Sequence, residues 1–193
     1  GGVIMMGKDK ENPLGIKTLK GDRLKLMSEL FDGTIMPGIQ GGPLMHIIMS
    51  KAVAFGEVLD KSFEDYAKQV IKNATRLSDE LIKRGFDVIS GGTDNHLMLL
   101  DLTNKSISGK KAELTLGAAG ITVNKNMIPF DTKSPFVTSG VRIGTPAVTT
   151  RGMKEDQMVL IADFIDNAIK NVEDEALLRS VKRDVKYLCE EYP

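Results

Sequence analysis

The sequence predicts a small α+β or α/β sandwich over residues 60–193, in which helices cover one face of a mainly antiparallel sheet. After residue 60 the predicted elements follow the order helix, paired strands, helix, strands, helix and helix. The predicted helices carry apolar residues at spacings of three and four, so each has one face to bury. The sequence shows no internal repeat or low-complexity tract.

The N-terminal part carries weaker patterns. Apolar residues at 2–6 predict a short buried strand, and the polar, glycine-containing stretch 7–22 predicts an exposed loop. A short helix is expected over 22–31. The glycines and prolines of 37–43 exclude regular structure there. A further helix is expected over 43–59, with proline at its first position.

A long amphipathic helix is predicted to begin at Ser62, and Gly85 stands where a left-handed residue would end it. Short apolar stretches separated by turn residues predict strands downstream, with a helix over 109–119 among them. Two amphipathic helices close the chain. Their apolar faces comprise Met158, Ile161, Ile165, Ile169 and Val172 in the first, and Leu178, Val181, Val185, Leu188 and Tyr192 in the second. The strands are expected over 87–90, 96–102, 121–124, 136–137 and 141–143.

Composition excludes several functional classes. The 193 residues suffice for a sizeable core, and Lys+Arg equals Asp+Glu at 26 each, so no broad basic surface points to nucleic acid. No apolar run is long enough to span a bilayer, and the single cysteine, Cys189, excludes an internal disulfide. We therefore expect a cytoplasmic protein without nucleic-acid or membrane partners. Its abrupt apolar start suggests a piece of a longer protein.

Arg142 is the most informative residue, because it interrupts a short apolar strand flanked by glycines. Arginine is seldom buried unless it is paired, and its planar guanidinium matches a carboxylate through two parallel hydrogen bonds. Two interpretations are open from position alone. Arg142 either forms an internal ion pair with an acid of this chain or faces a cleft and binds an anionic ligand.

Two further motifs could carry chemistry. Gly41 and Gly42 precede Pro43 at a predicted helix start, where free N–H groups and the helix dipole favour a phosphate; the alternative is a simple tight turn. Asn124 and Asn126 could read the edge of a heterocycle, or they could serve only turn chemistry. The two histidines, His46 and His96, and Cys189 lack metal-ligand spacing, so we expect no metal site.

Several blocks in one order resemble the serine hydroxymethyltransferase family. These are pyridoxal-phosphate enzymes of the aspartate aminotransferase fold, fold type I, that move a one-carbon unit between serine and tetrahydrofolate and leave glycine. The resemblance covers nearly the whole chain and is carried by residues 1–4, 37–46, 51–55, 90–97, 121–126, 134–142 and 144–147. Several such blocks in one order, among them Pro-Gly-Ile-Gln-Gly-Gly-Pro and Ser-Pro-Phe-Val-Thr-Ser-Gly-Val-Arg, are highly specific, whereas any one of them alone is not.

The resemblance implies a role for each matching residue. Arg142 would hold the carboxylate of serine or glycine. Gly41 and Gly42 would present N–H groups to the phosphate of pyridoxal 5'-phosphate held by the neighbouring subunit, which implies a homodimer. Asn126 would contact the pterin ring of tetrahydrofolate, and Ser134, Pro135 and Phe136 would line the same pocket.

The resemblance also implies what the chain lacks. The family's lysine that binds the cofactor covalently lies just upstream of the glycine pair seen here at 1–2, so no catalytic residue is assigned within this chain. Residues 1–59 would be the end of the large cofactor-binding domain with its linking helix, and 60–193 the small domain. The region 7–32 is longer and more charged than expected of the bacterial family. The fragment alone is expected to be inactive.

Two alternatives remain. Another enzyme of the same fold type, such as a threonine aldolase or an aminotransferase, would share the arginine but not the folate motifs. A stand-alone binding module without catalysis would also fit a chain that lacks the lysine.

Overall fold

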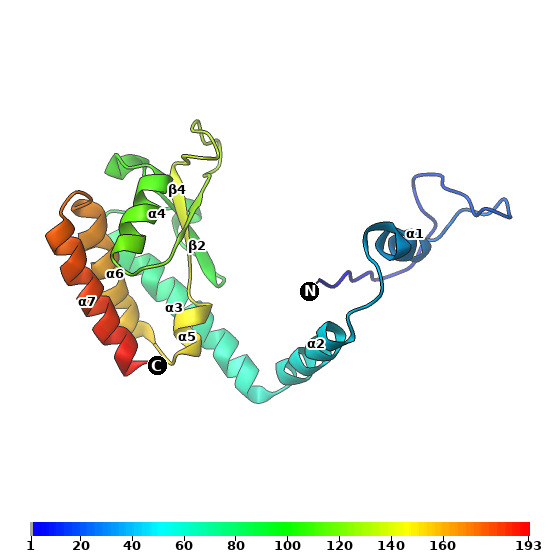
Figure 1. The fold of residues 1–193 in the computed structure, drawn as a ribbon, viewed down its shortest axis with the longest axis horizontal. Helices are drawn as coiled ribbons and strands as arrows, with labels where there is room; N and C mark the ends of the chain where they lie inside the picture. The colour runs from blue at the N-terminus through cyan, green and yellow to red at the C-terminus, as the bar shows by residue number, and fades with distance from the viewer. Residues whose placement is uncertain (1) are drawn as a thin grey trace. The chain divides into compact units, whose positions relative to one another are not determined.

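The computed structural model describes residues 2–193, which divide into two compact units: one ends at Asp60, and the other spans Lys61–Pro193. Gly1, where the first block of the family resemblance begins, lies outside the described residues. Figure 1 shows the chain coloured from its N-terminus to its C-terminus. None of the helices within the described residues is long and apolar enough to cross a membrane.

The first unit contains helix α1 (Met27–Gly33), a π-helical turn η1 (Thr34–Ile39) and helix α2 (Met45–Val58). The predicted strand over 2–6 is wrong, because these residues are irregular and exposed, with Met5 90% exposed. A strand needs the N–H and C=O groups of a neighbouring strand, and none of the described residues supplies them here. The apolar pattern alone could not reveal that.

The loop that precedes α1 is exposed, as predicted, but it has internal order. Asn12 is buried, and its side chain accepts a hydrogen bond from the Ile16 N–H and donates to the Ile16 and Lys25 carbonyl oxygens. Isolated bridges join Glu11 to Leu26 and Lys17 to Leu24. The charged stretch therefore folds back on itself around one asparagine.

The predictions around the two glycines need correction. Pro37 and Gly38 lie within η1, so regular structure is not excluded over the whole of 37–43. Helix α2 begins at Met45, two residues after Pro43, because Leu44 is extended and its carbonyl accepts the first helical hydrogen bonds. The proline therefore leads into the helix instead of occupying its first position.

The second unit contains an antiparallel sheet, as the sequence predicts. Within the described residues its strand order is β1-β2-β4-β3, from β1 (Asp87–Val88), β2 (Leu97–Asp101), β4 (Gly140–Gly144) and β3 (Asn124–Asn126). Side chains alternate along each strand. Met98 and Leu100 of β2 and the valine and isoleucine of β4 are buried, whereas the residues between them face away from the core.

Helices cover the buried face of this sheet (Figure 1). Helices α3 (Lys61–Lys83) and α4 (Gly109–Ala118) lie against the strands, α6 (Glu155–Lys170) packs against these two helices, and α7 (Glu175–Glu191) packs against α6 and α4. Helix α3 is the predicted amphipathic helix, and Gly85 follows it at φ +77°. The largest fully buried side chains that join sheet and helices are Leu77, Leu81, Leu100, Leu102, Leu116, Val141, Met153, Met158 and Ile165.

One predicted strand is shifted along the chain, and another is not formed. The strand expected over 121–124 is observed as β3 at 124–126, so the asparagines lie in the strand and do not follow it. The strand expected over 136–137 is a turn, because the N–H groups of Val137 and Thr138 both donate to the carbonyl oxygen of Ser134. The short helix α5 (Pro146–Thr150) was not predicted.

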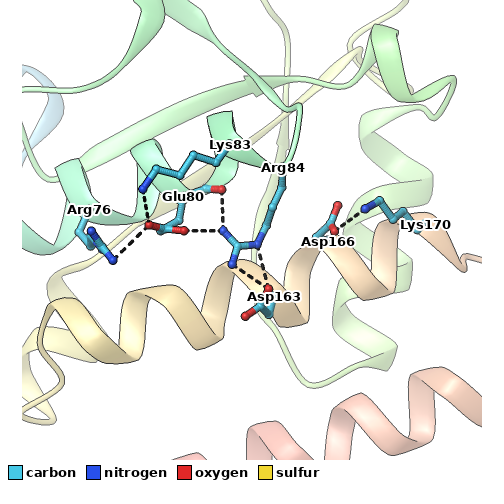
Figure 2. A network of polar contacts seen from close by, with 7 residues as sticks. All are labelled: Arg76, Glu80, Lys83, Arg84, Asp163, Asp166 and Lys170. Atoms are coloured by element: carbon cyan, nitrogen blue, oxygen red, sulfur yellow. Dashed lines mark hydrogen bonds and ion pairs between the residues drawn. The ribbon is translucent and has the colours of Figure 1, made fainter.

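A charged network joins α3 to α6 (Figure 2). The Glu80 carboxylate contacts Arg76 at 3.2 Å, Lys83 at 2.8 Å and Arg84 at 2.7 Å, and Arg84 continues to Asp163 at 2.7 Å. The Glu80 side chain is only 7% exposed, so its charge needs these partners. The network fixes the two helices that carry much of the core.

Candidate functional site

The candidate site of the second unit begins with Arg142, at the centre of β4. Its neighbours Val141 and Ile143 are buried against the helices, so the alternation turns Arg142 to the opposite face of the sheet, where it is exposed. Leu99 of β2 and Asn124 of β3 stand opposite Arg142 in the strand register, and directly opposed side chains share a face. We call this the open face, and it comprises Leu97, Leu99, Asp101, Asn124, Asn126, Arg142 and the two terminal glycines of β4.

The guanidinium of Arg142 has no hydrogen-bond or ion-pair partner among residues 2–193. The acids nearest to it in the strand register, such as Asp101, are engaged elsewhere: the Asp101 carboxylate accepts a hydrogen bond from the Thr103 N–H at 2.8 Å. An internal ion pair, the first of the two interpretations, is therefore not formed within the described chain. A permanently charged fork is left facing outward.

The backbone that carries Arg142 is held firmly on its C-terminal side. Thr145, fully buried, donates its hydroxyl to the carbonyl oxygen of Val70 on α3 at 2.9 Å, and its N–H donates to the His96 carbonyl at 3.0 Å. The next residue, Pro146, opens α5, and its carbonyl accepts from the Tyr66 hydroxyl. The arginine is thus positioned by a strand whose end is bonded to two other elements.

Asn126 lies at the end of β3, opposite Gly140, on the same open face. Its side-chain amide donates to the carbonyl oxygen of Met127 at 2.7 Å, which leaves its amide oxygen available. Asn124, opposite Arg142, is exposed. The strand register therefore brings Asn126 and Arg142 to one face, two residues apart along the sheet.

The segment from 127 to 139 connects β3 to β4 and carries Ser134, Pro135 and Phe136. These three are exposed, with Phe136 at 80%, and they belong to the turn closed on the Ser134 carbonyl. We call residues 127–139 the connecting loop. Because its two ends are Asn126 and Gly140, which face each other in the sheet, the loop returns to the edge of the open face.

Asp131 organises this loop and was missed at the sequence level. Its carboxylate accepts hydrogen bonds from the N–H groups of Ile128, Lys133 and Ser139 and from the Ser139 hydroxyl. The bond from the Lys133 N–H contributes most to a pKa lowered to about 2, since each donor favours the ionised form. An aspartate that accepts from the N–H two residues later is common in loops, so Asp131 carries no special signal in the sequence. What sets this aspartate apart is the pair of donors from Ser139, which only the structure reveals.

Gly41 and Gly42 lie in the first unit, in the extended segment ahead of α2. Both are exposed, and a Cβ built on either would meet nothing within 4 Å. Their N–H groups donate to no acceptor among residues 2–193. Free N–H groups with open space beside them suit an approaching phosphate, although the helix begins later than predicted.

Within the described residues, no cluster of three or more His, Cys, Asp and Glu side chains could hold a metal ion. Among residues 2–193, the open face combines the unpartnered guanidinium of Arg142, the amides of Asn124 and Asn126, and the connecting loop beside them. Such a surface can orient an anionic substrate and a heterocycle, and it contains no nucleophile activated by a neighbouring base.

Comparison with known proteins gives the family. The family model described as serine hydroxymethyltransferase matches residues 1–165. A protein named serine hydroxymethyltransferase from Chlorobium phaeovibrioides (strain DSM 265 / 1930) is 60% identical over 194 residues, an alignment that covers 98% of this chain and 44% of that protein. The chain thus spans less than half the length of this relative. On the family match and this identity, the chain belongs to the serine hydroxymethyltransferase family.

Proposed function

We propose that this chain supplies the carboxylate-binding and folate-binding parts of a pyridoxal-phosphate enzyme that transfers the hydroxymethyl group between serine and tetrahydrofolate, leaving glycine. The observation that carries the proposal is the unpartnered guanidinium of Arg142 on the face that also holds Asn126. Family membership supports the reaction, and the position of Arg142 and Asn126 on one face supports the division of roles.

Arg142 binds the α-carboxylate of serine or glycine. Its fork donates two parallel hydrogen bonds to the two carboxylate oxygens, which fixes the orientation of the amino acid as well as its position. Because the guanidinium has no internal partner to leave, binding does not require an existing ion pair to break. Lysine at this position would keep the charge but lose the planar fork, and asparagine would lose both.

Asn126 and the segment Ser134–Phe136 bind tetrahydrofolate. An amide offers both a donor and an acceptor to the edge of the pterin ring, and the exposed Phe136 offers an apolar face to it. The loop ends beside Asn126 and continues directly into β4, so the folate-binding segment and the carboxylate-binding residue share one strand connection.

Gly41 and Gly42 donate N–H groups to the phosphate of pyridoxal 5'-phosphate bound mainly by a second subunit, which makes the functional enzyme a homodimer. The open space beside both Cα atoms and the free N–H groups support this role. When bound, the cofactor supplies an electron sink for bond cleavage at the substrate amino acid. This chain contributes binding, orientation and charge around it.

The proposal includes fold type I, with residues 1–59 as the end of the large domain and its linking helix, and 60–193 as the small domain of a cytoplasmic enzyme. The covalent attachment of the cofactor belongs to a lysine outside these 193 residues. We therefore expect the 193 residues alone to be inactive.

Two other functions fit part of the site. A threonine aldolase or aminotransferase of the same fold type would use Arg142 in the same way but would have no use for a folate segment. A stand-alone binding module would bind an amino acid through Arg142 without turnover.

Exchange of the glycine Cα hydrogen separates these three. A protein of the relatives' full length that contains this chain is incubated with glycine in deuterium oxide, and the loss of the Cα proton signal is followed with and without tetrahydrofolate. Exchange accelerated by tetrahydrofolate supports the proposal. Exchange indifferent to tetrahydrofolate indicates the aldolase or aminotransferase, and binding of glycine without exchange indicates the binding module.

A further inference from the structure

The three residues proposed to contact folate make few contacts with the rest of the second unit. Ser134, Pro135 and Phe136 are exposed, and the turn on the Ser134 carbonyl supplies only local hydrogen bonds. These bonds fix the internal shape of the turn but not its position on the protein. Its position relative to Asn126 must therefore be set elsewhere in the connecting loop.

The far end of the loop is anchored to the core of the second unit. The N–H groups of Gly109 and Lys110, at the start of α4, donate to the carbonyl oxygens of Thr138 and Val137 at 3.1 and 2.9 Å. Thr138 adopts φ +55°, a strained backbone for a β-branched residue. The segment that follows Phe136 is thus held by N–H groups of the first turn of α4, which have no acceptor within the helix.

The near end of the loop has a different anchor, the carboxylate of Asp131. Its Oδ2 accepts from the Ser139 N–H at 2.8 Å and from the Ile128 N–H at 3.3 Å, and its Oδ1 accepts from the Ser139 hydroxyl at 2.8 Å and from the Lys133 N–H at 2.9 Å. Ile128 lies two residues after Asn126, and Ser139 lies one residue before β4. The carboxylate therefore ties the outgoing and returning arms of the loop together at their base.

All four donors are uncharged, and three are backbone N–H groups, so the carboxylate acts on backbone position and not on a neighbouring charge. Lys133 immediately precedes Ser134, and its N–H is one of the donors. A shift of Asp131 would thus be transmitted to the folate-binding turn through one peptide bond. The lowered pKa of Asp131 agrees with an ionised carboxylate that accepts these hydrogen bonds.

We propose that Asp131 is a positioning residue for folate: by bridging Ile128, Lys133 and Ser139 it holds Ser134–Phe136 in register with Asn126. The proposal rests on the proposed function, since it assigns folate to this turn. It predicts a selective effect, because Arg142 is held mainly by the pairing of β4 with β2 and β3 and by the Thr145 bond to α3, none of which involves Asp131.

The test uses a protein of the relatives' full length that contains this chain, with Asp131→Ala, Asp131→Asn and Ser139→Ala. Asp131→Ala removes all four acceptor bonds and raises KM for tetrahydrofolate about tenfold or more, while the calorimetric affinity for serine stays within about twofold. Asp131→Asn retains one oxygen acceptor, so its effect lies between that of Ser139→Ala, the smallest, and that of Asp131→Ala.

Asp174→Ala is the matched control. Asp174 is also an aspartate that accepts from the N–H two residues later, at 3.0 Å, but it caps α7 and takes no part in the loop. It should lower stability without changing either substrate affinity. Hydrogen exchange gives an independent readout: the amides of Ile128, Lys133 and Ser139 should exchange faster in Asp131→Ala and unchanged in the control.

The outcomes are distinct. If the parent protein does not bind tetrahydrofolate, the proposed function fails and this inference fails with it. If the parent binds tetrahydrofolate but Asp131→Ala changes KM for tetrahydrofolate by less than about twofold, or changes serine affinity equally, only the positioning role is overturned. Should Asp131→Ala not fold, the ordering of Asp131→Asn above Ser139→Ala decides the question in the same way.

Discussion

Asn73 on α3 and Thr149 on α5 are joined by a buried hydrogen bond, in which the asparagine Nδ2 donates to the threonine Oγ1 at 2.9 Å. The same Nδ2 donates to the Met153 carbonyl at 2.9 Å, and the Thr149 hydroxyl donates to the Thr145 carbonyl at 2.8 Å. Because Thr145 follows β4 directly, this chain of bonds connects the middle of α3 to the strand that carries Arg142. A buried polar network of this kind holds position only while all its members are satisfied.

Asn73→Ala should therefore destabilise the protein. The change leaves the Met153 carbonyl without its donor in the core, and we expect the free energy of unfolding to fall by about 1–3 kcal/mol. Urea denaturation of the full chain measures it. Asn167→Ala, at an exposed position of the neighbouring α6, should change the free energy of unfolding by less than about 0.5 kcal/mol. Equal effects at the two positions would contradict a structural role for the network.

In a protein of the relatives' full length that contains this chain, Arg142→Ala should impair serine turnover without loss of stability. Hydrogen bonds to charged groups contribute about 1.5–3 kcal/mol each, so the loss of two bonds corresponds to a fall on the order of a hundredfold or more in kcat/KM for serine. Arg142→Lys keeps the charge but not the fork and should lie between. The urea midpoint should not change, since the side chain is exposed and unpartnered among the described residues. Parent-like kinetics for serine in Arg142→Ala would remove this residue from the site.

Gly140→Ala should separate the two central strands. A Cβ at Gly140 would lie 2.5 Å from the Leu100 carbonyl oxygen and 2.7 Å from the Ile128 side chain, and backbone cannot yield at that distance. We expect a loss of about 1–3 kcal/mol in stability together with weaker serine binding, because the strand carries Arg142. Gly117→Ala is the control: no atom lies within 4 Å of its Cβ, and in helix α4 the change should stabilise by up to about 1 kcal/mol. Thermal unfolding of both variants distinguishes a clash from a general intolerance of alanine.

Stability should decrease as the pH is lowered, because the Glu80 carboxylate is ion-paired in the folded protein. Its hydrogen bonds from Lys83, and next from Arg84, lower the pKa of the Glu80 carboxyl from 4.5 to about 2 in the folded protein. Between these values the unfolded chain binds the proton more readily, so this contribution is complete above pH 4.5 and is lost as pH falls toward 2. Glu80→Gln should flatten the pH dependence of the urea midpoint between pH 5 and pH 3, relative to the parent. An unaltered slope would show that Glu80 does not contribute to the pH dependence of stability in this range.

The sequence was sufficient for the elements whose pattern is local. Helix α3 repeats apolar residues at spacings of three and four and ends before a glycine, and both signals depend only on the helix itself. The strand around Arg142 could be predicted for the same reason, but its position alone left both an internal ion pair and an anion-binding role open.

Elements that depend on distant partners were not predictable in this way. The apolar stretch at 2–6 has the composition of a strand, but a strand also needs a neighbour, and composition does not report one. The turn at Ser134 was missed for another reason: Phe136 and Val137 have the composition of a strand, although the N–H groups of Val137 and Thr138 both donate to the nearby Ser134 carbonyl. Asp131 was missed because its donors come from both sides of the loop, up to eight residues away.

The alternation along β4 has a consequence for how this protein can change. Val141 and Ile143 pack against the helices, while Arg142 between them is exposed, so with the proposed role of Arg142 adjacent positions act separately on stability and on ligand affinity. Substitution at one position can alter the substrate range without first weakening the core. In such a strand, three consecutive residues let mutation or design change the stability of the core and the chemistry of the open face almost independently.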